Sequence, residues 1–392
     1  MKILQIVPSL NIGGVERGTL DLVIAIKEAG HEAHVASNGG LLLARLRRHG
    51  CIHHDLPLHS KNPFIMLRNY IRLKRLVETE QIDLIHARSR VPAWIGYFVA
   101  KSCSIPFVTT FHGTYNFKNR LKKYYNSIMT KGDKVIAISD FIRQHILTHY
   151  KMDEEKIKVI ARGVDVEHFS PDRVHGEQLV QLSAKWRLPD DRPIIMLPAR
   201  LSRWKGHLFL LDALDILNRK MRLAQPAMQE TSKPFHCIFV GDDEDSDSYQ
   251  KTILQKIEDY QFQGMVQFTG KHDDMPIALM LADVVVSAST DPEAFGRVVT
   301  EAQAMGRPVV APAHGGALEQ INHGVTGWLY PPEDAEKLAE CLYIAINLHQ
   351  AARAKFALAT RENVLNRFSL NQMSRQTIQL YETLHKQEKI GK

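Results

Sequence analysis

The chain has 392 residues, of which 44% are hydrophobic and 24% are charged. Such a composition is typical of a globular protein long enough for two domains with separate cores, and it excludes fibrous and intrinsically disordered proteins. The sequence has no repeat of solenoid length and no low-complexity tract. Its four cysteines lack the spacing of a metal site or a redox pair, which indicates reduced structural thiols.

The formal net charge of +7 comes from the first 170 residues. Two basic clusters lie there, Arg68/Arg72/Lys74/Arg75 and Lys118/Arg120/Lys122/Lys123. Solvated helix faces account for such clusters, and so does attraction to an anionic membrane surface or an anionic acceptor. Because the sequence contains no recognised nucleic-acid motif, we expect no nucleic-acid partner.

The N-terminal segment does not resemble a secretion signal. The apolar run Ile3–Val7 is ended by Pro8 and is too short for the core of a signal peptide. No apolar run in the sequence approaches the roughly 20 residues that span a bilayer. We therefore expect a cytoplasmic protein, with the inner face of the cytoplasmic membrane as a candidate peripheral location.

In the first half of the chain, short apolar runs alternate with longer helical patterns. The clearest helix is predicted over residues 15–29, where Gly30 ends it. Strands are predicted at Ile3–Val7, His34–Ala36, Leu84–His86, Phe107–Phe111 and Val135–Ile138.

The alternation starts again after residue 170. Further strands are predicted at Ile194–Leu197, Cys237–Val240, Val266–Phe268, Val284–Ser287 and Val309–Ala311, and helices at Gly206–Lys220, Phe295–Met305 and Asp334–Leu348. A Gly-rich turn and a short strand are predicted within 324–332. This pattern predicts an α/β fold with two Rossmann-like, doubly wound parallel-sheet domains and a cleft between them. In such sheets ligands bind beyond the carboxyl ends of the strands, so strand-to-helix turns are the places to look for a site.

Two turns of the first half carry candidate site residues. Gly13 and Gly14 follow the first strand, and adjacent glycines either let the backbone approach a ligand closely or make a tight turn before a helix. Their spacing is not Gly-x-Gly-x-x-Gly, which disfavours a nicotinamide-dependent oxidoreductase. His112 ends another strand, where a histidine serves either packing or acid–base chemistry.

Three turns of the second half carry charged or flexible residues. Arg200 and Lys205 lie in one strand-to-helix turn and suit a diphosphate, although exposed loop cations are the alternative. Gly241 opens an acidic turn over 242–247, whose spacing does not match an EF-hand, so we interpret it as an acidic helix N-terminus and expect no metal. Lys271 lies in the turn after the predicted strand 266–268.

Two carboxylates frame the next turn and its helix. Glu293 precedes the predicted helix, and Phe295 and Gly296 are its first residues. Glu301 lies about two helical turns further along the same helix. A carboxylate accepts two hydrogen bonds and so pairs well with the vicinal hydroxyls of a sugar. The alternative makes Glu293 a partner of the helix dipole and Glu301 an exposed helix residue.

Residues 283–334, with two glutamates separated by seven residues and a Phe-Gly after the first, closely resemble the donor-binding segment of glycosyltransferase family 4. Residues 194–206 resemble the phosphate-binding Arg and Lys-Gly of the same family, and His112-Gly113 and Gly13-Gly14-x-Glu16 resemble two further motifs. These enzymes transfer sugars with retention of configuration and have the GT-B fold. The resemblance implies an acceptor-binding domain over 1–170, a nucleotide-sugar-binding domain over 171–365 and a C-terminal helix over 366–392 that packs back on the first domain.

The resemblance also implies a role for each candidate residue. Arg200 and Lys205 would hold the diphosphate, Glu301 the ribose and Glu293 the donor sugar. His112 with Gly13 and Gly14 would complete the reaction centre. Further donor contacts would come from Gly241, Lys271, Phe295 and Gly296. No metal or other cofactor is expected.

The expected reaction moves a sugar from a UDP- or GDP-linked donor to a glycan or lipid-linked acceptor, as in lipopolysaccharide or cell-surface polysaccharide biosynthesis. Residues 85–90, which end a predicted strand, are a further candidate for acceptor contacts. Two alternatives remain open at this point. One is a nucleotide-sugar epimerase on the same architecture, and the other is a non-catalytic module that binds sugar nucleotides.

Overall fold

The structure is a computed structural model, and it describes residues 1–11, 13–115, 117, 119–224, 232–242 and 247–391. The chain divides into two compact units. Unit 1 comprises Met1–Gly163 and Leu370–Lys392, and unit 2 comprises Val164–Ser369.

Unit 1 is built on a seven-stranded parallel sheet with the strand order β3-β2-β1-β4-β5-β6-β7. The order reverses between β1 and β4, which is where ligands bind in doubly wound sheets. The strands are β1 (Lys2–Ile6), β2 (Glu32–Ser37), β3 (Ile52–Asp55), β4 (Leu84–Ala87), β5 (Phe107–Phe111), β6 (Lys134–Ala137) and β7 (Ile157–Val159).

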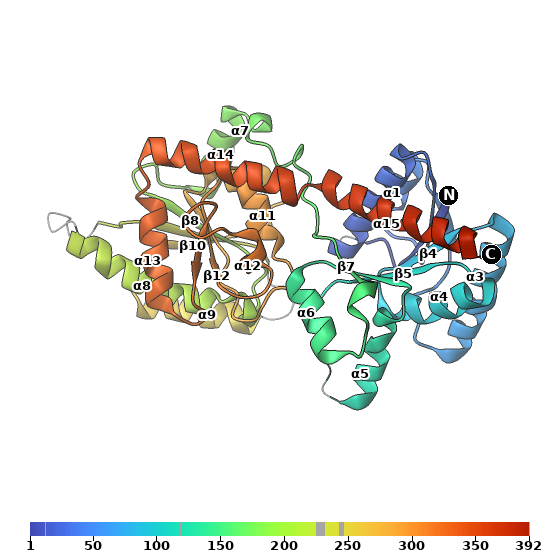
Figure 1. The fold of residues 1–392 in the computed structure, drawn as a ribbon. Helices are drawn as coiled ribbons and strands as arrows, with labels where there is room; N and C mark the ends of the chain where they lie inside the picture. The colour runs from blue at the N-terminus through green and yellow to red at the C-terminus, as the bar shows by residue number, and fades with distance from the viewer. Residues whose placement is uncertain (12, 116, 118, 225–231, 243–246, 392) are drawn as a thin grey trace. The chain divides into compact units, whose positions relative to one another are not determined.

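The helices of unit 1 cover this sheet and include the end of the chain. Leu380, Tyr381 and Leu384 of the C-terminal helix α15 are buried in the core with residues of α1, and Figure 1 shows α15 (red) beside α1 (blue). Burying a large aliphatic side chain contributes about 1.5–3 kcal/mol, so this helix is an integral part of the unit. The helices are α1 (Gly14–Glu28), α2 (Leu43–Arg48), α3 (Pro63–Glu80), α4 (Arg90–Cys103), α5 (Arg120–Asn126), α6 (Asp140–His149) and α15 (Leu370–Gly391).

Unit 2 has a six-stranded parallel sheet with the order β10-β9-β8-β11-β12-β13. This is the strand order of the Rossmann fold, with the reversal between β8 and β11. The strands are β8 (Ile194–Pro198), β9 (His236–Val240), β10 (Val266–Gly270), β11 (Val284–Val286), β12 (Val309–Pro312) and β13 (Trp328–Tyr330).

Helices of unit 2 contribute apolar side chains to the core of its sheet. In α8, for example, Leu210, Leu214, Leu217 and Met221 recur at helical spacing and join the core of the sheet. The helices are α7 (Gly176–Trp186), α8 (His207–Ala224), α9 (Asp247–Asp259), α10 (Met275–Leu281), α11 (Arg297–Ala304), α12 (Ala317–Gln320), α13 (Ala335–Ile346) and α14 (Gln350–Arg367). Across the described ranges, no helix combines the length and the apolarity needed to cross a bilayer.

The predicted fold class, two Rossmann-like domains with doubly wound parallel sheets, is confirmed. The sequence pattern missed two edge strands: β3 is Ile-His-His-Asp and mostly polar, and β7 has only three residues. Helix α11 begins at Arg297 rather than at Phe295, because Gly296 adopts a left-handed conformation with φ of +80°.

Candidate active site

In unit 2, the turns after β8 and β11 meet at the reversal of the strand order. Thr290 N donates to the carbonyl oxygen of Trp204 at 2.9 Å. A Cβ at Gly206, where φ is +73°, would lie 1.8 Å from the carbonyl oxygen of Ala288. Only glycine fits at such a close approach of two backbones, so Gly206 holds the two turns together.

This packing brings Lys205 and Glu293 into contact. Lys205 Nζ donates to Glu293 Oε1 at 2.8 Å, and Ser289 Oγ donates to the same oxygen at 2.6 Å. The side chains of Lys205 and Glu293 are 15% and 21% exposed, so both are reachable from solvent yet partly desolvated. Lys205 Nζ also lies 4.1 Å from the centre of the Trp204 ring. Arg200 lies exposed in the same turn. A cation and a carboxylate are therefore in contact, and a second cation lies exposed in the same turn as the first.

Glu301 lies on the helix that follows Glu293. It is buried, and Arg297 Nη2 donates to its Oε1 at 2.5 Å across one helical turn. Phe295 packs under the helix start, with its ring centre 6.0 Å from that of Phe368. The interpretation of Glu301 as an exposed helix residue is therefore wrong, because its carboxylate is turned into the protein.

The turn Glu293–Gly296 rests on the two glycines after β12. Gly316 N donates to the carbonyl oxygen of Glu293 at 2.9 Å. A Cβ at Gly315, where φ is +59°, would lie 2.5 Å from the same oxygen, and a Cβ at Gly316 would lie 2.4 Å from the carbonyl oxygen of Phe295. Gln320 Nε2 donates to that oxygen at 2.6 Å. The glycine pair thus supports the backbone that carries Glu293.

The neighbouring turns after β9 and β10 hold Gly241 and Lys271. A Cβ at Gly241 would lie 2.1 Å from the carbonyl oxygen of Ala199. Lys271 N donates to Asp242 Oδ1 at 2.8 Å, while its side chain is mostly exposed. Residues 243–246 of the acidic turn lie outside the described residues. Within the described parts of the chain, no three or more His, Cys, Asp or Glu side chains are grouped to hold a metal ion.

In unit 1, polar residues cluster at the carboxyl ends of β4 and β5. His86 shares one hydrogen bond with Thr110 Oγ1 at 2.7 Å and another with the hydroxyl of Tyr381 at 2.6 Å. His86, Thr110 and Tyr381 are all buried. The C-terminal helix therefore reaches into the edge of the sheet where His112 lies.

His112 follows β5, and both of its ring nitrogens are buried without a hydrogen-bond partner among the described residues. Burial lowers the pKa of His112 well below its usual value, and the charges of Arg88, Arg162 and His86 lower it further. His112 is therefore neutral near pH 7, with one N–H to donate and one ring nitrogen to accept. Unsatisfied polar atoms of this kind are costly in a protein interior, which favours a role in binding a ligand.

Gly13 and Gly14 lie where α1 begins, beyond the carboxyl end of β1. Gly13 is the N-cap residue, and a Cβ there would lie 2.3 Å from Glu16 Oε2. The first backbone N–H groups of a helix have no partner within the helix and suit an anionic or hydroxyl-bearing ligand.

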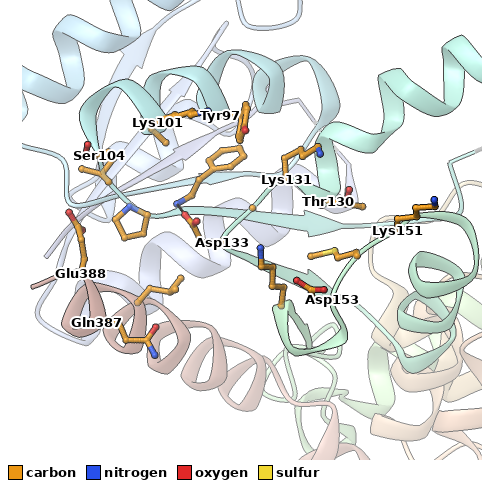
Figure 2. Close-up of a pocket in the computed structure, with 18 residues that line it drawn as sticks. Tyr97, Lys101, Ser104, Thr130, Lys131, Asp133, Lys151, Asp153, Gln387 and Glu388 are labelled. Carbon is orange, nitrogen blue, oxygen red and sulfur yellow. Dashed lines mark hydrogen bonds between the residues drawn. The ribbon is translucent and has the colours of Figure 1, made fainter. Parts of the chain in front are cut away.

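A separate cavity of about 880 Å³ opens at the other end of the unit 1 sheet. It lies where β5 and β6 begin, and Figure 2 shows Lys101 and Ser104 on one side and Gln387 and Glu388 of α15 on the other. None of the predicted site residues lines it. Ligands of doubly wound sheets bind at the carboxyl ends of the strands, so we do not place the reaction here.

The structure thus brings Lys205 and Glu293 into contact and places the other predicted residues of each unit at strand-to-helix turns, with Glu301 further along in α11. It also adds three residues to which the sequence gave no role. Arg297 lies four residues before Glu301, a spacing at which oppositely charged helix residues pair, so the sequence contained a signal for it. Ser289 and Gly315 contact Glu293 only because the turns are folded together, and no pattern in the sequence indicates these contacts.

Comparisons with known proteins identify the family of the chain. Residues 12–168 match the family model Glycosyltransferase Family 4, and residues 181–362 match Glycosyl transferases group 1. A solved glycosyltransferase from Rickettsia africae ESF-5 is 39% identical, with 98% of each chain covered and a TM-score of 0.87.

Two more distant relatives carry more specific names. Anabaena HepE, solved with UDP, is 24% identical over 98% of this chain and 100% of that chain, with a TM-score of 0.82, and it is also solved with UDP-glucose. A putative colanic acid biosynthesis glycosyltransferase of Escherichia coli K12, WcaL, is 26% identical over 70% of this chain and 64% of that protein.

The chain therefore belongs to the group 1 glycosyltransferases, with an N-terminal domain of glycosyltransferase family 4. It is a glycosyltransferase whose two Rossmann-like units are those of the GT-B fold.

Proposed function

We propose that this enzyme transfers a sugar, with retention of anomeric configuration, from a nucleoside-diphosphate sugar to a glycan or lipid-linked acceptor. The observation that carries the proposal is the contact of Lys205 with Glu293 at the strand-order reversal of unit 2. A cation for phosphate and a carboxylate for sugar hydroxyls are the two groups that such a donor requires. UDP is the first nucleotide to test, since Anabaena HepE was solved with UDP and with UDP-glucose. GDP remains the second candidate.

In this proposal each group of residues meets one part of the donor. Lys205 and Arg200 hold the diphosphate and stabilise the negative charge that develops on it. Glu301 accepts hydrogen bonds from the ribose and Glu293 from the transferred sugar, while backbone near Gly241, Lys271 and Phe295–Gly296 borders the nucleotide. His112 and the turn Gly13–Gly14 contribute the sugar and acceptor contacts of unit 1. The proposed role of Lys205 needs no metal.

The bond changes balance without an enzymic base. The bond from the anomeric carbon to the phosphate oxygen breaks, and a bond from that carbon to the acceptor oxygen forms on the same face of the sugar. The proton of the acceptor hydroxyl passes to the departing phosphate oxygen. Lys205 and Arg200 assist by compensating the charge of this oxygen before the proton arrives.

A ligand panel and a turnover assay test this function. We expect UDP or GDP to raise the melting temperature of the protein, since a ligand at 100 times its Kd stabilises the folded state by about 2.7 kcal/mol. ADP should have a smaller effect. Absence of a shift with every nucleotide and nucleotide-sugar would refute the proposed donor class. Incubation with donor alone separates the alternatives: an epimerised sugar nucleotide would indicate an epimerase, and tight binding without turnover on any acceptor would indicate a binding module.

We further propose that unit 1 meets its acceptor at an anionic membrane surface, as in the biosynthesis of lipopolysaccharide or another cell-surface polysaccharide. The name of the E. coli relative supports this class of product. The structure places exposed apolar side chains on three neighbouring helices: Leu67 on α3, Phe98 on α4 and Tyr124 on α5 are 60%, 51% and 67% exposed. Leu67 and Phe98 line one groove of about 390 Å³ with Trp94, whose ring centre is 5.5 Å from that of Tyr124.

Exposed cations border these apolar side chains. Arg68 and Arg72 lie on α3, and Lys122 lies on α5. Apolar groups that enter the interface and cations that face anionic lipid are the two components of peripheral membrane binding. Lys118 of the second basic cluster lies outside the described residues.

Vesicle binding checks this surface. We expect the protein to sediment with phosphatidylglycerol vesicles at low salt and not with phosphatidylcholine vesicles. The pair Arg68→Glu and Arg72→Glu should abolish binding, because each basic residue near such a surface contributes about 1 kcal/mol. The exposed lysines Lys185 and Lys251 of unit 2, changed to glutamate, are the matched control and should leave binding unchanged. Equal loss in both pairs, or no binding by the wild type, would contradict this surface.

A further inference from the structure

Two guanidinium groups of unit 1 donate hydrogen bonds to backbone carbonyl oxygens in the first turns of α1. Arg162 Nη2 donates to the carbonyl oxygen of Gly14 at 2.6 Å, and Arg88 Nη1 donates to that of Gly18 at 3.0 Å. Gly14 and Gly18 are four residues apart, so they lie on one face of the helix. Both arginines come from other parts of the unit: Arg88 follows β4, and Arg162 follows β7.

The two glycines make room for the two cations. A Cβ at Gly14 would lie 2.9 Å from Arg162 Nη2, and a Cβ at Gly18 would lie 2.8 Å from Arg88 Nη2. A side chain at either position would push the guanidinium away from the carbonyl that it binds. Gly14 belongs to the turn that we assign to the reaction, so Arg162 binds this turn directly.

Arg88 is buried at 6% exposure, which is costly for a charged group. Its Nη1 donates to two neutral oxygens, the carbonyl oxygen of Gly18 and Gln5 Oε1 at 3.4 Å. Glu16, Asp21 and Tyr381 act on it electrostatically. An apolar residue could fill this space at lower cost, so packing alone does not explain a buried cation here.

The same two cations act on His112. Burial is the main cause of its lowered pKa, and Arg88, Arg162 and His86 are the groups whose charges add to it. Since a nearby cation disfavours protonation of an imidazole, removing either arginine should raise the pKa of His112. His112 and the turn Gly13–Gly14 are thus connected to one pair of guanidinium groups.

We propose that Arg88 and Arg162 are positioning residues for sugar transfer, which hold the turn Gly13–Gly14 through α1 and keep the surroundings of His112 positively charged. This inference rests on the proposed function, in which that turn and His112 face the substrates. The planar fork of arginine reaches a fixed carbonyl in a fixed direction, whereas the ammonium of lysine keeps the charge on a flexible stem. Lysine variants therefore keep the positive charge near His112 but lose the fixed contact with α1, so they distinguish the effect of the charge from the effect of the position of the turn.

The experiment compares Arg88→Lys, Arg88→Met, Arg162→Lys and Arg162→Met in the full-length enzyme. We expect kcat to fall about 10²-fold in all four, since a displacement of about 1 Å in a reaction centre has that effect. The Kd for UDP or GDP should change less than about threefold, because Lys205 and Glu293 in unit 2 are untouched. The exposed Arg17 of α1, changed to methionine, is the matched control and should behave as wild type.

The pH profile of kcat gives a readout that a purely structural role would not change. If His112 works in the neutral form, activity falls as pH drops through its pKa. The methionine variants should move this acid limb to higher pH, while the lysine variants keep it in place at the same reduced kcat. If Arg88→Met does not fold, the variants Arg162→Lys and Arg162→Met test the inference by themselves, since Arg162 is only partly buried.

Three outcomes would overturn the inference. The first is an unchanged kcat in the Arg162 variants, and the second is an acid limb that stays in place in the methionine variants. The third is a loss of kcat accompanied by proportional losses of nucleotide affinity and melting temperature. Failure of the proposed function looks different. It would appear in the wild type, as absence of sugar transfer from every donor tested, before any variant is compared.

Discussion

Lys205→Ala is expected to lower turnover about 10²- to 10³-fold, the range seen when one group that stabilises developing negative charge is removed from an active site. The side chain of Lys205 is only 15% exposed, and its ammonium group lies 2.8 Å from Glu293 Oε1 and 4.1 Å from the centre of the Trp204 ring. A water molecule in its place cannot supply a fixed positive charge to the diphosphate. The melting temperature should fall modestly, because the mostly buried carboxylate of Glu293 loses its cation but keeps the hydrogen bond from Ser289.

Steady-state kinetics with a saturating acceptor, together with calorimetric titration of UDP or GDP, measure this effect. Lys355, an exposed lysine of α14, changed to alanine is the matched control and should retain full activity. Full activity of Lys205→Ala would refute the assignment of Lys205 to the diphosphate. A loss of nucleotide binding in a protein that has no turnover even as wild type would instead support a binding module.

Glu293→Gln is expected to reduce turnover more than nucleotide affinity. Its Oε1 accepts hydrogen bonds from Lys205 and Ser289. The amide oxygen of glutamine can accept hydrogen bonds in the same place, but it carries no negative charge. Loss of a charged hydrogen bond to the transferred sugar removes about 1.5–3 kcal/mol, or roughly 10- to 100-fold in rate. Binding of the free nucleoside diphosphate, which lacks the sugar, should change little.

Glu301→Gln provides the comparison, since Glu301 is assigned to the ribose and should affect nucleotide affinity for any donor sugar. The two variants are measured side by side for kcat and for the Kd of the free nucleotide. Equal damage to both quantities in both variants would contradict the division of roles between the two carboxylates. Because Arg297 pairs with Glu301, a partial loss of helix stability in Glu301→Gln is measured separately by thermal unfolding.

Most of the fold follows from local patterns. Buried strands such as Ile194–Pro198 are continuous apolar runs, and α1 ends next to Gly30, so alternation and length are sufficient to predict them. The strands β3 and β7 escape this reasoning because they are short edge strands, one of them mostly polar. The late start of α11 escapes it because the left-handed conformation of Gly296 depends on the turn around it.

The candidate site divides in the same way. The residue types at strand-to-helix turns, namely Lys205, Glu293 and His112, were identifiable from the sequence, since charged and polar residues after buried strands stand out. The burial of the candidate residues and their hydrogen-bond partners could not be identified from the sequence. The sequence left Glu301 between an exposed helix residue and a ligand contact, and the structure shows a buried carboxylate paired with Arg297.

The sequence by itself determined two parallel α/β domains and the positions along the chain at which ligand-binding residues occur. Only the tertiary structure decided that Lys205 and Glu293, 88 residues apart, share a hydrogen bond. It alone placed Arg88 and Arg162 against α1. The physical reason is that strand order and the close packing of turns on glycine backbones, as at Gly206 and Gly315, bring distant residues together, and local propensities carry no information about such contacts.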